Sequence, residues 1–183
     1  LSNGASTIMF EGVPSYPDFS RFWQIIDKYK VNQFYTAPTA IRALAKQGIG
    51  HFKDCSLKSL KVLGTVGEPI NEEAWQWYNL HVGKDTCPIV DTWWQTETGG
   101  ILISSIPKII LDKPTFATKP FIGVQPILLD DEGEELNKPN TVGKLCIKYP
   151  WPSIARTIWG NHQRYIDTYF SKCQLLYLQE LLP

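Results

Sequence analysis

The chain has 183 residues, with 18 lysines and arginines against 18 aspartates and glutamates, so its formal net charge is zero. This balance excludes a nucleic-acid-binding protein that works through bulk charge, because such proteins carry an excess of basic residues. Hydrophobic residues make up 43% of the chain and charged residues 20%, which is typical of a folded globular protein.

The sequence has no stretch that predicts a membrane span. The strongly apolar stretch over residues 100–111 is far shorter than the roughly 20 residues that a membrane-spanning helix needs. We therefore expect a soluble, cytoplasmic protein that does not bind membranes. The cysteines are too far apart in the sequence for a zinc or redox motif and are interpreted as buried or incidental thiols: Cys55, Cys87, Cys146 and Cys173.

Strand-like and helix-like segments alternate in the first half of the chain. Residues 6–10 predict a strand and residues 18–29 a helix, because apolar side chains recur at helical spacing in the second segment. A second strand is predicted over residues 31–37 and a second helix from Pro38, since proline suits the first turn of a helix.

The next two strands are predicted over residues 60–66 and 87–93, with Asn71 as the N-cap of the helix between them. Strands that alternate with helices at this spacing favour a mostly parallel sheet. Ligands of such sheets bind at the carboxyl ends of the strands. The turns that follow the strands are therefore the candidate sites.

The helical period disappears after residue 106. Residues 124–129 and 142–148 instead predict antiparallel strands. Residues 151–170 hold a third candidate cluster, with Arg156, His162, Arg164 and Tyr165, whose favoured interpretation is a surface segment with ordinary charges. The predicted fold class is α/β, with a mostly parallel αβ subdomain followed by an antiparallel β-barrel-like region. The predicted domains are residues 1–106, residues 107–172 and a divergent tail over residues 173–183.

The turn over residues 64–70 is the first candidate site. Its glycines allow a flat ligand to approach the backbone, and Glu68 supplies a carboxylate. The alternative is a tight turn whose acid only begins the next helix.

The segment over residues 91–100 is the second candidate site. Trp93 and Trp94 are adjacent in a strand and so point to opposite sides, which lets one of them face a pocket. Beside them, Thr96 can donate to a phosphate oxygen and Glu97 can hold Mg²⁺. The alternative is a tryptophan pair in the core followed by a solvated polar end.

Four segments of the chain carry a family resemblance: residues 34–42, 64–70, 88–100 and 156–162. Their motifs, order and spacing resemble those of the AMP-forming acetyl-CoA synthetases (acetate–CoA ligases) of the adenylate-forming superfamily. The likeness runs from about residue 1 to residue 172. It implies that the chain forms part of the large domain of such an enzyme.

The resemblance implies a two-step reaction that uses ATP, Mg²⁺ and coenzyme A. Acetate attacks the α-phosphate of ATP to give acetyl-AMP and pyrophosphate, and the thiol of CoA then displaces AMP. The implied partners are these small molecules alone. A carboxylate that attacks a phosphate is repelled by its charge, so a cation and a hydroxyl donor at the site stabilise the developing charge.

The resemblance also implies roles for individual residues. Thr96 and Glu97 are the implied catalytic residues, with Thr96 bonded to the α-phosphate and Glu97 holding Mg²⁺. Val66 and Trp94 close the implied acetate pocket, and Ser15 stands where the family often has an asparagine near CoA. The implied ATP- and AMP-binding residues are Gly67, Glu68, Pro69, Asp91, Thr92, Trp93 (against the adenine face), Trp94, Gln95 and Thr96.

Some motifs of the family are missing between residues 1 and 183. The phosphate loop of the family precedes the matched segments, and its Thr-Gly-Asp motif and adenylation lysine follow them. Leu181 stands near the position of that aspartate, so residues 173–183 are interpreted as the product of a frameshift or alternative splice. We expect an incomplete synthetase that is inactive alone. The alternatives are a non-catalytic remnant that binds nucleotide weakly or joins a full-length relative, and a carbohydrate-binding module.

Overall fold

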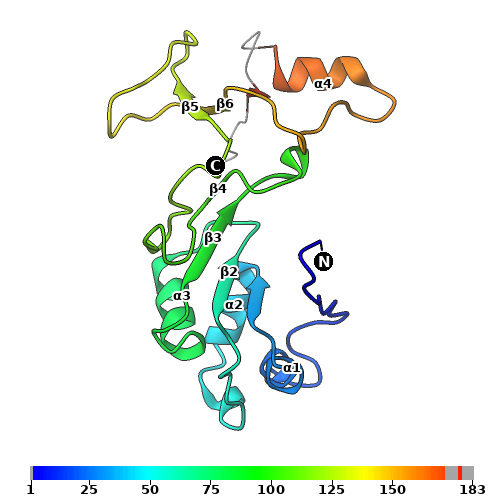
Figure 1. Ribbon diagram of the computed structural model, residues 1–183, viewed down its shortest axis with the longest axis vertical. Coiled ribbons are helices and arrows are strands. Elements are labelled where there is room, and N and C mark those ends of the chain that lie inside the picture. The colour runs from blue at the N-terminus through cyan, green and yellow to red at the C-terminus, as the bar shows by residue number, and fades with distance from the viewer. Residues whose placement is uncertain (1, 172–176, 179–183) are drawn as a thin grey trace. The chain divides into compact units, whose positions relative to one another are not determined.

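The computed structural model describes residues 2–171 and the backbone of residues 177–178. The chain divides into two compact units, Leu1–Val90 and Asp91–Pro183. The α-helices and strands are, in chain order, α1 (Arg21–Tyr29), β1 (Gln33–Thr36), α2 (Pro38–Ala45), β2 (Val62–Thr65), α3 (Glu72–Trp77), β3 (Ile89–Trp93), β4 (Ile103–Ser104), β5 (Pro126–Leu129), β6 (Lys144–Ile147), α4 (His162–Tyr169) and β7 (Tyr177–Leu178). Figure 1 labels all of them except β1 and β7.

A parallel strand pair forms the centre of the first unit. β1 runs parallel to β2, in a register that pairs Gln33 with Val62 and Thr36 with Thr65. β3 follows β2 in the strand order, and the N–H of Leu63 donates to the carbonyl of Pro88 at 3.0 Å. The predicted alternation of strands and helices is confirmed from residue 18 onward.

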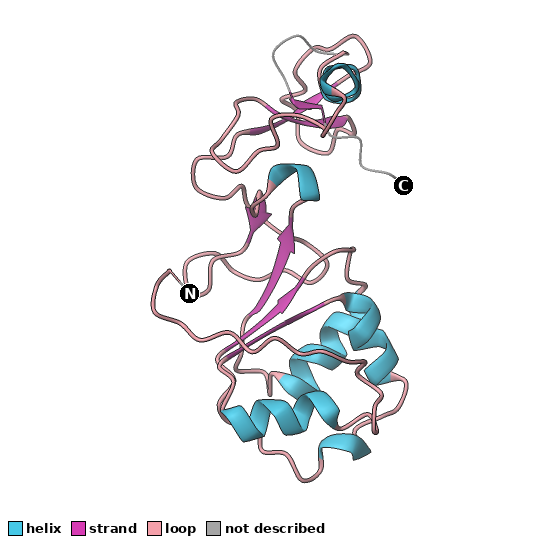
Figure 2. Cartoon of the chain, turned by 90° about the vertical axis from the view of Figure 1, so that its right-hand side faces the viewer, coloured by secondary structure: helices cyan, strands magenta, loops and turns pink. Residues whose placement is uncertain are grey.

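The helices of the first unit gather on one side of these strands, as Figure 2 shows. Trp23 of α1 is 1% exposed, and its ring packs edge-on against Phe34 of β1 and against Phe52. The hydroxyl of Tyr78 donates to the carbonyl of Phe34 at 3.2 Å. Burial raises the pKa of Tyr78 far above its ordinary value, so this hydroxyl remains a donor.

The start of the first unit differs from the sequence-based prediction. The predicted strand over residues 6–10 is wrong, because this segment forms no regular element and no described residue pairs with it as a strand partner. Met9 is 92% exposed. The first helix begins at Arg21 and not at Asp18, whose carboxylate instead accepts a hydrogen bond from the N–H of Ser20 at 2.7 Å.

Two helix starts bear out their predictions to different degrees. Pro38 is the first residue of α2, as predicted. Asn71 immediately precedes α3, also as predicted, but its side chain forms no capping hydrogen bond with the described residues. Glu72 and Glu73 lie in the first turn of α3, where their negative charges interact favourably with the positive end of the helix dipole.

The second unit is built from antiparallel strand pairs. β5 pairs with β6 from Pro126–Ile147 to Leu129–Lys144, which confirms the antiparallel strands predicted in this region. β6 also pairs with the short strand β7. The predicted boundary between residues 106 and 107 stays a prediction. The interpretation of residues 173–183, including Leu181, falls outside the described residues except for the backbone of residues 177–178.

Helix α4 was missed by the sequence analysis, and the expectation that no helix follows residue 106 is wrong. Its starting signal is Asn161, whose side-chain oxygen accepts from the N–H of Arg164 at 2.9 Å. Tyr165 is the buried residue of α4 and joins a core with Leu102 and Ile147. None of the described helices is long and apolar enough to cross a membrane.

Candidate functional site

The turn after β2 is shaped by a glycine in the left-handed backbone region. Gly67 has a φ of +93°, a conformation that other residues adopt only with strain. A Cβ built on Gly67 would meet no atom within 4 Å, so its outer side is open. Val66 is half-buried and Pro69 is exposed, while the strand end Thr65 beneath them is fully buried.

The carboxylate of Glu68 is bound to the start of α2. Its Oε1 accepts hydrogen bonds from the N–H of Thr39, at 2.7 Å, and from the Thr39 hydroxyl. Its Oε2 forms an ion pair with Nη2 of Arg42 at 2.8 Å. The Thr39 hydroxyl, followed by Arg42, lowers the pKa of Glu68 from its ordinary value. The Glu68 side chain thus ties the turn to α2.

Tyr35 lies over the strand that leads to this turn. It is paired with Gly64 in the register of β1 and β2, and a Cβ on Gly64 would come within 2.6 Å of the Tyr35 ring. Tyr35 is 50% exposed. Because side chains two residues apart share a face of a strand, Val66 follows on the same face. Tyr35 is a candidate lining residue that the sequence analysis missed, and only the strand register reveals it.

The tryptophans of the second candidate site differ in exposure. Trp93 is half-buried and packs against the core of Leu102 and Tyr165, whereas Trp94 is 38% exposed. Asp91 and Thr92, which precede them, are buried. The strand alternation therefore gives the two indoles different surroundings.

The main chain after Trp94 is held in place by partly buried hydrogen bonds. The N–H of Gln95 donates to the hydroxyl of Thr98 at 2.9 Å, and Thr98 is fully buried. The carbonyl of Thr98 accepts from the hydroxyl of Ser153 at 2.8 Å and from the indole of Trp151 at 3.2 Å. Gly99 has a φ of +65°, and a Cβ on it would lie 2.3 Å from the Ser153 carbonyl oxygen. The chain here admits little besides glycine.

Glu97 is held at both its side chain and its main chain. Its Oε1 accepts from the hydroxyl of Tyr169 at 2.7 Å, and its carbonyl accepts from the N–H of Ala155 at 2.7 Å. Burial, followed by the nearby carboxylate, raises the pKa of Tyr169 to about 12. The neighbouring Thr96 is exposed.

The donor set around Glu97 fits a magnesium ion that is shared with a phosphate. The described residues contain no group of three histidine, cysteine, aspartate or glutamate side chains that can hold a metal ion. Mg²⁺ commonly takes one or two protein carboxylates and completes its shell with water and substrate phosphates. Glu97 can supply one such carboxylate, because its second oxygen accepts no hydrogen bond from the described residues, and the residue before it in the sequence, Thr96, is exposed.

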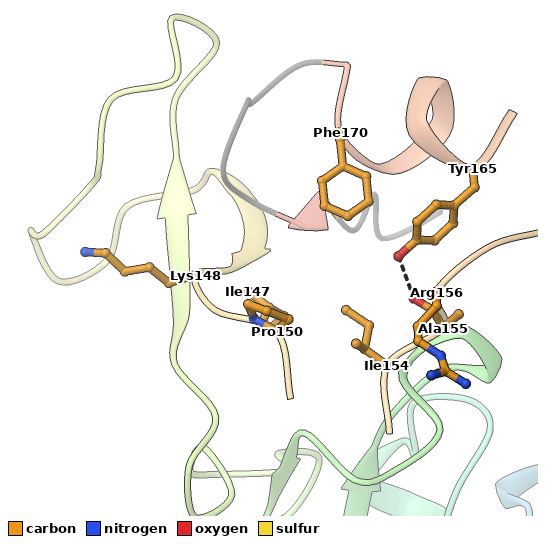
Figure 3. Close-up of a pocket in the computed structure, with 8 residues that line it drawn as sticks. All are labelled: Ile147, Lys148, Pro150, Ile154, Ala155, Arg156, Tyr165 and Phe170. Atoms are coloured by element: carbon orange, nitrogen blue, oxygen red, sulfur yellow. Dashed lines mark hydrogen bonds between the residues drawn. The ribbon is translucent and has the colours of Figure 1, made fainter. Parts of the chain in front are cut away.

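A cavity of about 310 Å³ lies elsewhere in the second unit, under α4 (Figure 3). Its rim carries two cations, Lys148 and Arg156, and Lys148 is paired with Glu135 at 3.1 Å. The hydroxyl of Tyr165 donates to the carbonyl of Ala155 across this cavity wall. The lining residues are Ile147, Lys148, Pro150, Ile154, Ala155, Arg156, Tyr165 and Phe170.

The predicted site residues fall into three places. Val66, Gly67, Glu68 and Pro69 form one turn of the first unit. Those from Asp91 to Glu97 are contiguous and lie in the second unit. Ser15, in contrast, is exposed in a separate turn near the start of the first unit.

The comparisons with known proteins first define the class. The family model of the AMP-binding enzymes matches residues 1–159, and the chain belongs to this family. Its fold is similar to that of a crystal structure of the anthranilate CoA ligase AuaEII in complex with anthranoyl-AMP, with a TM-score of 0.79 and 25% sequence identity. That match covers 96% of this chain and 31% of the ligase. The predicted α/β fold class and superfamily are confirmed.

The sequence relatives are more specific. The acetyl-coenzyme A synthetase of Leptospira biflexa is 62% identical over 173 residues, which cover 94% of this chain and 26% of that protein. Acetyl-coenzyme A synthetase 2 of Pseudomonas aeruginosa is 60% identical over 170 residues, covering 93% of this chain and 26% of that protein. The chain therefore spans about a quarter of the length of the curated relatives it matches. The resemblance to acetyl-CoA synthetases is confirmed.

Proposed function

We propose that the chain is a segment of an AMP-forming acetate–CoA ligase, which converts acetate and ATP to acetyl-AMP and then transfers the acetyl group to CoA. The observation that supports this most is the 62% identity to an acetyl-coenzyme A synthetase along 94% of the chain. The structural neighbour holds an acyl-adenylate, anthranoyl-AMP, which is the same class of compound as acetyl-AMP.

Thr96 and Glu97 are the proposed catalytic residues. The Thr96 hydroxyl is exposed and donates to an oxygen of the α-phosphate, where negative charge grows as acetate attacks. Glu97 offers its free carboxylate oxygen to Mg²⁺. When bound, this ion offsets the phosphate charge that repels the acetate anion. The hydrogen bond from Ser153 to the carbonyl of Thr98 and the close approach of Ser153 to Gly99 hold the main chain that follows these two residues.

Trp94 is the proposed selector of the acid. Its indole is large and only partly covered by the protein, so it fills space that a longer acyl chain needs. Val66 contributes an apolar surface of modest size. Trp93 is proposed to contact the face of adenine with the part of its indole that the core does not cover.

The turn after β2 is proposed to serve adenine mainly through its backbone. The Glu68 carboxylate is occupied by Thr39 and Arg42, whereas the open side of Gly67 allows a flat ring to approach the main chain. Asp91, Thr92 and Gln95 complete the proposed nucleotide-binding residues in the second unit, together with Pro69 in the first. Ser15 is the proposed contact with CoA.

We also propose that these 183 residues do not catalyse adenylation by themselves. The relatives named acetyl-coenzyme A synthetase are about four times as long as the segment they share with this chain. In phosphoryl chemistry, positioning and electrostatic stabilisation supply most of the rate enhancement. Positioning all three phosphates of ATP needs more groups than one hydroxyl and one carboxylate. Weak nucleotide binding without turnover is the alternative role of the chain alone.

A chimeric synthetase tests the proposal. In it, residues 2–171 of this chain replace the matching segment of the Leptospira biflexa synthetase. We expect acetate-dependent exchange of labelled pyrophosphate into ATP, and no exchange by the 183-residue chain alone. A folded chimera that activates a different acid, or none, would show that the proposal is wrong. Exchange by the 183-residue chain at the rate of the chimera would overturn its proposed inactivity.

A further inference from the structure

Tyr169 donates its hydroxyl to the carboxylate of Glu97, although the two residues are 72 positions apart in the sequence. The distance to Oε1 is 2.7 Å, an ordinary length for a hydroxyl–carboxylate hydrogen bond, and bonds to a charged acceptor are stronger than those between neutral groups. Tyr169 is half-buried at the end of α4, so its ring is packed and its hydroxyl has a defined position.

A second tyrosine of α4 reaches the main chain of Glu97 through Ala155. The carbonyl of Ala155 accepts from the hydroxyl of Tyr165, a contact drawn in Figure 3, while the N–H of Ala155 donates to the carbonyl of Glu97 at 2.7 Å. Tyr165 is 6% exposed and belongs to the core with Leu102 and Ile147. The anchor at this end is therefore a buried core residue.

The helix itself sets the spacing of the two contacts. Tyr165 and Tyr169 are four residues apart and lie on the same face of α4, with ring centroids separated by 5.5 Å. Asn161 caps the start of the helix through the N–H of Arg164. A capped helix with one tyrosine in the core thus delivers the second tyrosine to the Glu97 side chain.

The chemistry of this contact differs from that at Glu68. An arginine would neutralise the negative charge of a carboxylate, as Arg42 does for Glu68. A phenol hydroxyl is neutral, so it orients the carboxylate and leaves its charge for a cation. It also binds Oε1, and none of the described residues donates a hydrogen bond to Oε2. A glutamate side chain on the surface otherwise samples many rotamers, whose loss on binding costs free energy.

We propose that Tyr169 is a positioning residue for the metal-binding carboxylate of Glu97, and that Tyr165 supports it through Ala155. Tyr169 fixes one carboxylate oxygen so that the other is presented to the ion before the nucleotide arrives. This inference rests on the proposed function, which makes Glu97 the magnesium ligand.

The substitution Tyr169→Phe in the chimeric synthetase removes only the hydroxyl. Loss of a hydrogen-bond partner behind a metal ligand typically weakens metal binding 10- to 100-fold. We expect the Mg²⁺ concentration for half-maximal pyrophosphate exchange to rise about tenfold, with kcat at saturating Mg²⁺ nearly retained. The matched control is Tyr149→Phe, an exposed tyrosine of the same unit, which should leave the Mg²⁺ requirement unchanged.

A binding measurement gives a readout that does not depend on turnover. Mn²⁺ binding in the presence of ATP and without acetate is followed by electron paramagnetic resonance. Tyr169→Phe should weaken Mn²⁺ binding by the same factor as it raises the Mg²⁺ requirement. In a Glu97→Gln background, the same substitution should have no further effect, because the carboxylate it positions is gone.

Three outcomes separate this inference from the proposed function. If Glu97→Gln weakens Mn²⁺ binding and Tyr169→Phe does not, the positioning role is wrong and the proposed function stands. If Glu97→Gln leaves Mn²⁺ binding unchanged, Glu97 is not the metal ligand and both fail. If Tyr169→Phe lowers the melting temperature and kcat without a change in Mn²⁺ affinity, Tyr169 has a structural role alone and the inference is overturned.

Discussion

The two candidate turns use the same residue types in opposite ways. In the turn after β2, the side chain of Glu68 is bound to Thr39 and Arg42 and the backbone at Gly67 is open. In the segment after β3, the backbone at Gly99 is closed by Ser153, whereas Thr96 is exposed and the carboxylate of Glu97 accepts a hydrogen bond from a neutral hydroxyl. Each unit thus carries one turn, but one offers its main chain and the other its side chains.

The difference shows that a carboxylate at a strand end is not by itself a catalytic group. Glu68 has a cationic partner and two hydrogen bonds from the start of a helix, which are the contacts of a structural acid. Among the described residues, the side chain of Glu97 accepts a hydrogen bond from a neutral donor, Tyr169, and forms no ion pair. The nature of the partner, more than the position of the acid, distinguishes the two.

The largest expected effect concerns the two glycines. Gly99→Ala places a methyl group 2.3 Å from the carbonyl oxygen of Ser153, in addition to a strained φ, whereas Gly67→Ala adds only the strain. We expect Gly99→Ala to lower the free energy of unfolding by about 4 kcal/mol and Gly67→Ala by about 1 kcal/mol. Urea unfolding of the chain measures both. Equal losses of unfolding free energy in the two variants would mean that the backbone at Gly99 is not packed more tightly than the backbone at Gly67.

The next effect concerns the two tryptophans and is measured in the chimeric synthetase. Trp94→Gly should lower kcat/KM for acetate by a factor on the order of 10², because the methyl group of acetate loses its packing. Longer acids should gain about 0.8 kcal/mol for each methylene that becomes buried, so preference should move to acids of roughly five or more carbons.

Trp93→Gly is the matched control for this change of specificity. Its side chain packs against the core of the second unit, so its loss should weaken ATP binding and stability without a change in the preferred acid. A retained preference for acetate in Trp94→Gly together with an altered preference in Trp93→Gly would reverse the proposed roles.

The smallest expected effect is the pH dependence of the Glu68 contacts. The folded state lowers the pKa of Glu68 below its ordinary value of 4.5, so this carboxylate stabilises the fold above that pH. The contribution is lost as the pH falls through the lowered pKa. Because the pair is partly exposed, we expect Glu68→Gln to cost about 0.5 kcal/mol at neutral pH and almost nothing in strong acid.

Urea unfolding at a series of pH values checks this prediction, with Glu11→Gln as the control at an exposed glutamate of the same unit. A difference between the Glu68→Gln variant and the original chain that grows as the pH falls would contradict the assigned direction of the pKa shift.

The sequence predicted the elements whose signals are local. Apolar spacing located α1, and Pro38 located the start of α2. Strand 6–10 failed because an apolar run forms a strand only when a neighbour completes its hydrogen bonds. Helix α4 escaped prediction because it buries only Tyr165 among the residues that face the core, although Asn161 offered a capping signal.

The candidate site was predictable in its residue types but not in its contacts. The motif order located Thr96 and Glu97, since their neighbours in the sequence carry the family pattern. The contact between Tyr169 and Glu97 joins residues that are 72 positions apart, and the clash at Gly99 involves Ser153. Such contacts depend on how the chain returns to itself, which no local pattern encodes.

The different roles of Glu97, as the acid of the reaction, and Glu68, as a structural acid, are tested most directly by a paired measurement in the chimeric synthetase. Acetate-dependent pyrophosphate exchange is compared for Glu97→Gln and Glu68→Gln, at one limiting Mg²⁺ concentration. We predict that Glu97→Gln lowers the exchange rate on the order of 10²-fold and that Glu68→Gln lowers it far less. Equal losses in the two variants, or a larger loss in Glu68→Gln, would contradict the assignment of Glu97 as the acid of the reaction.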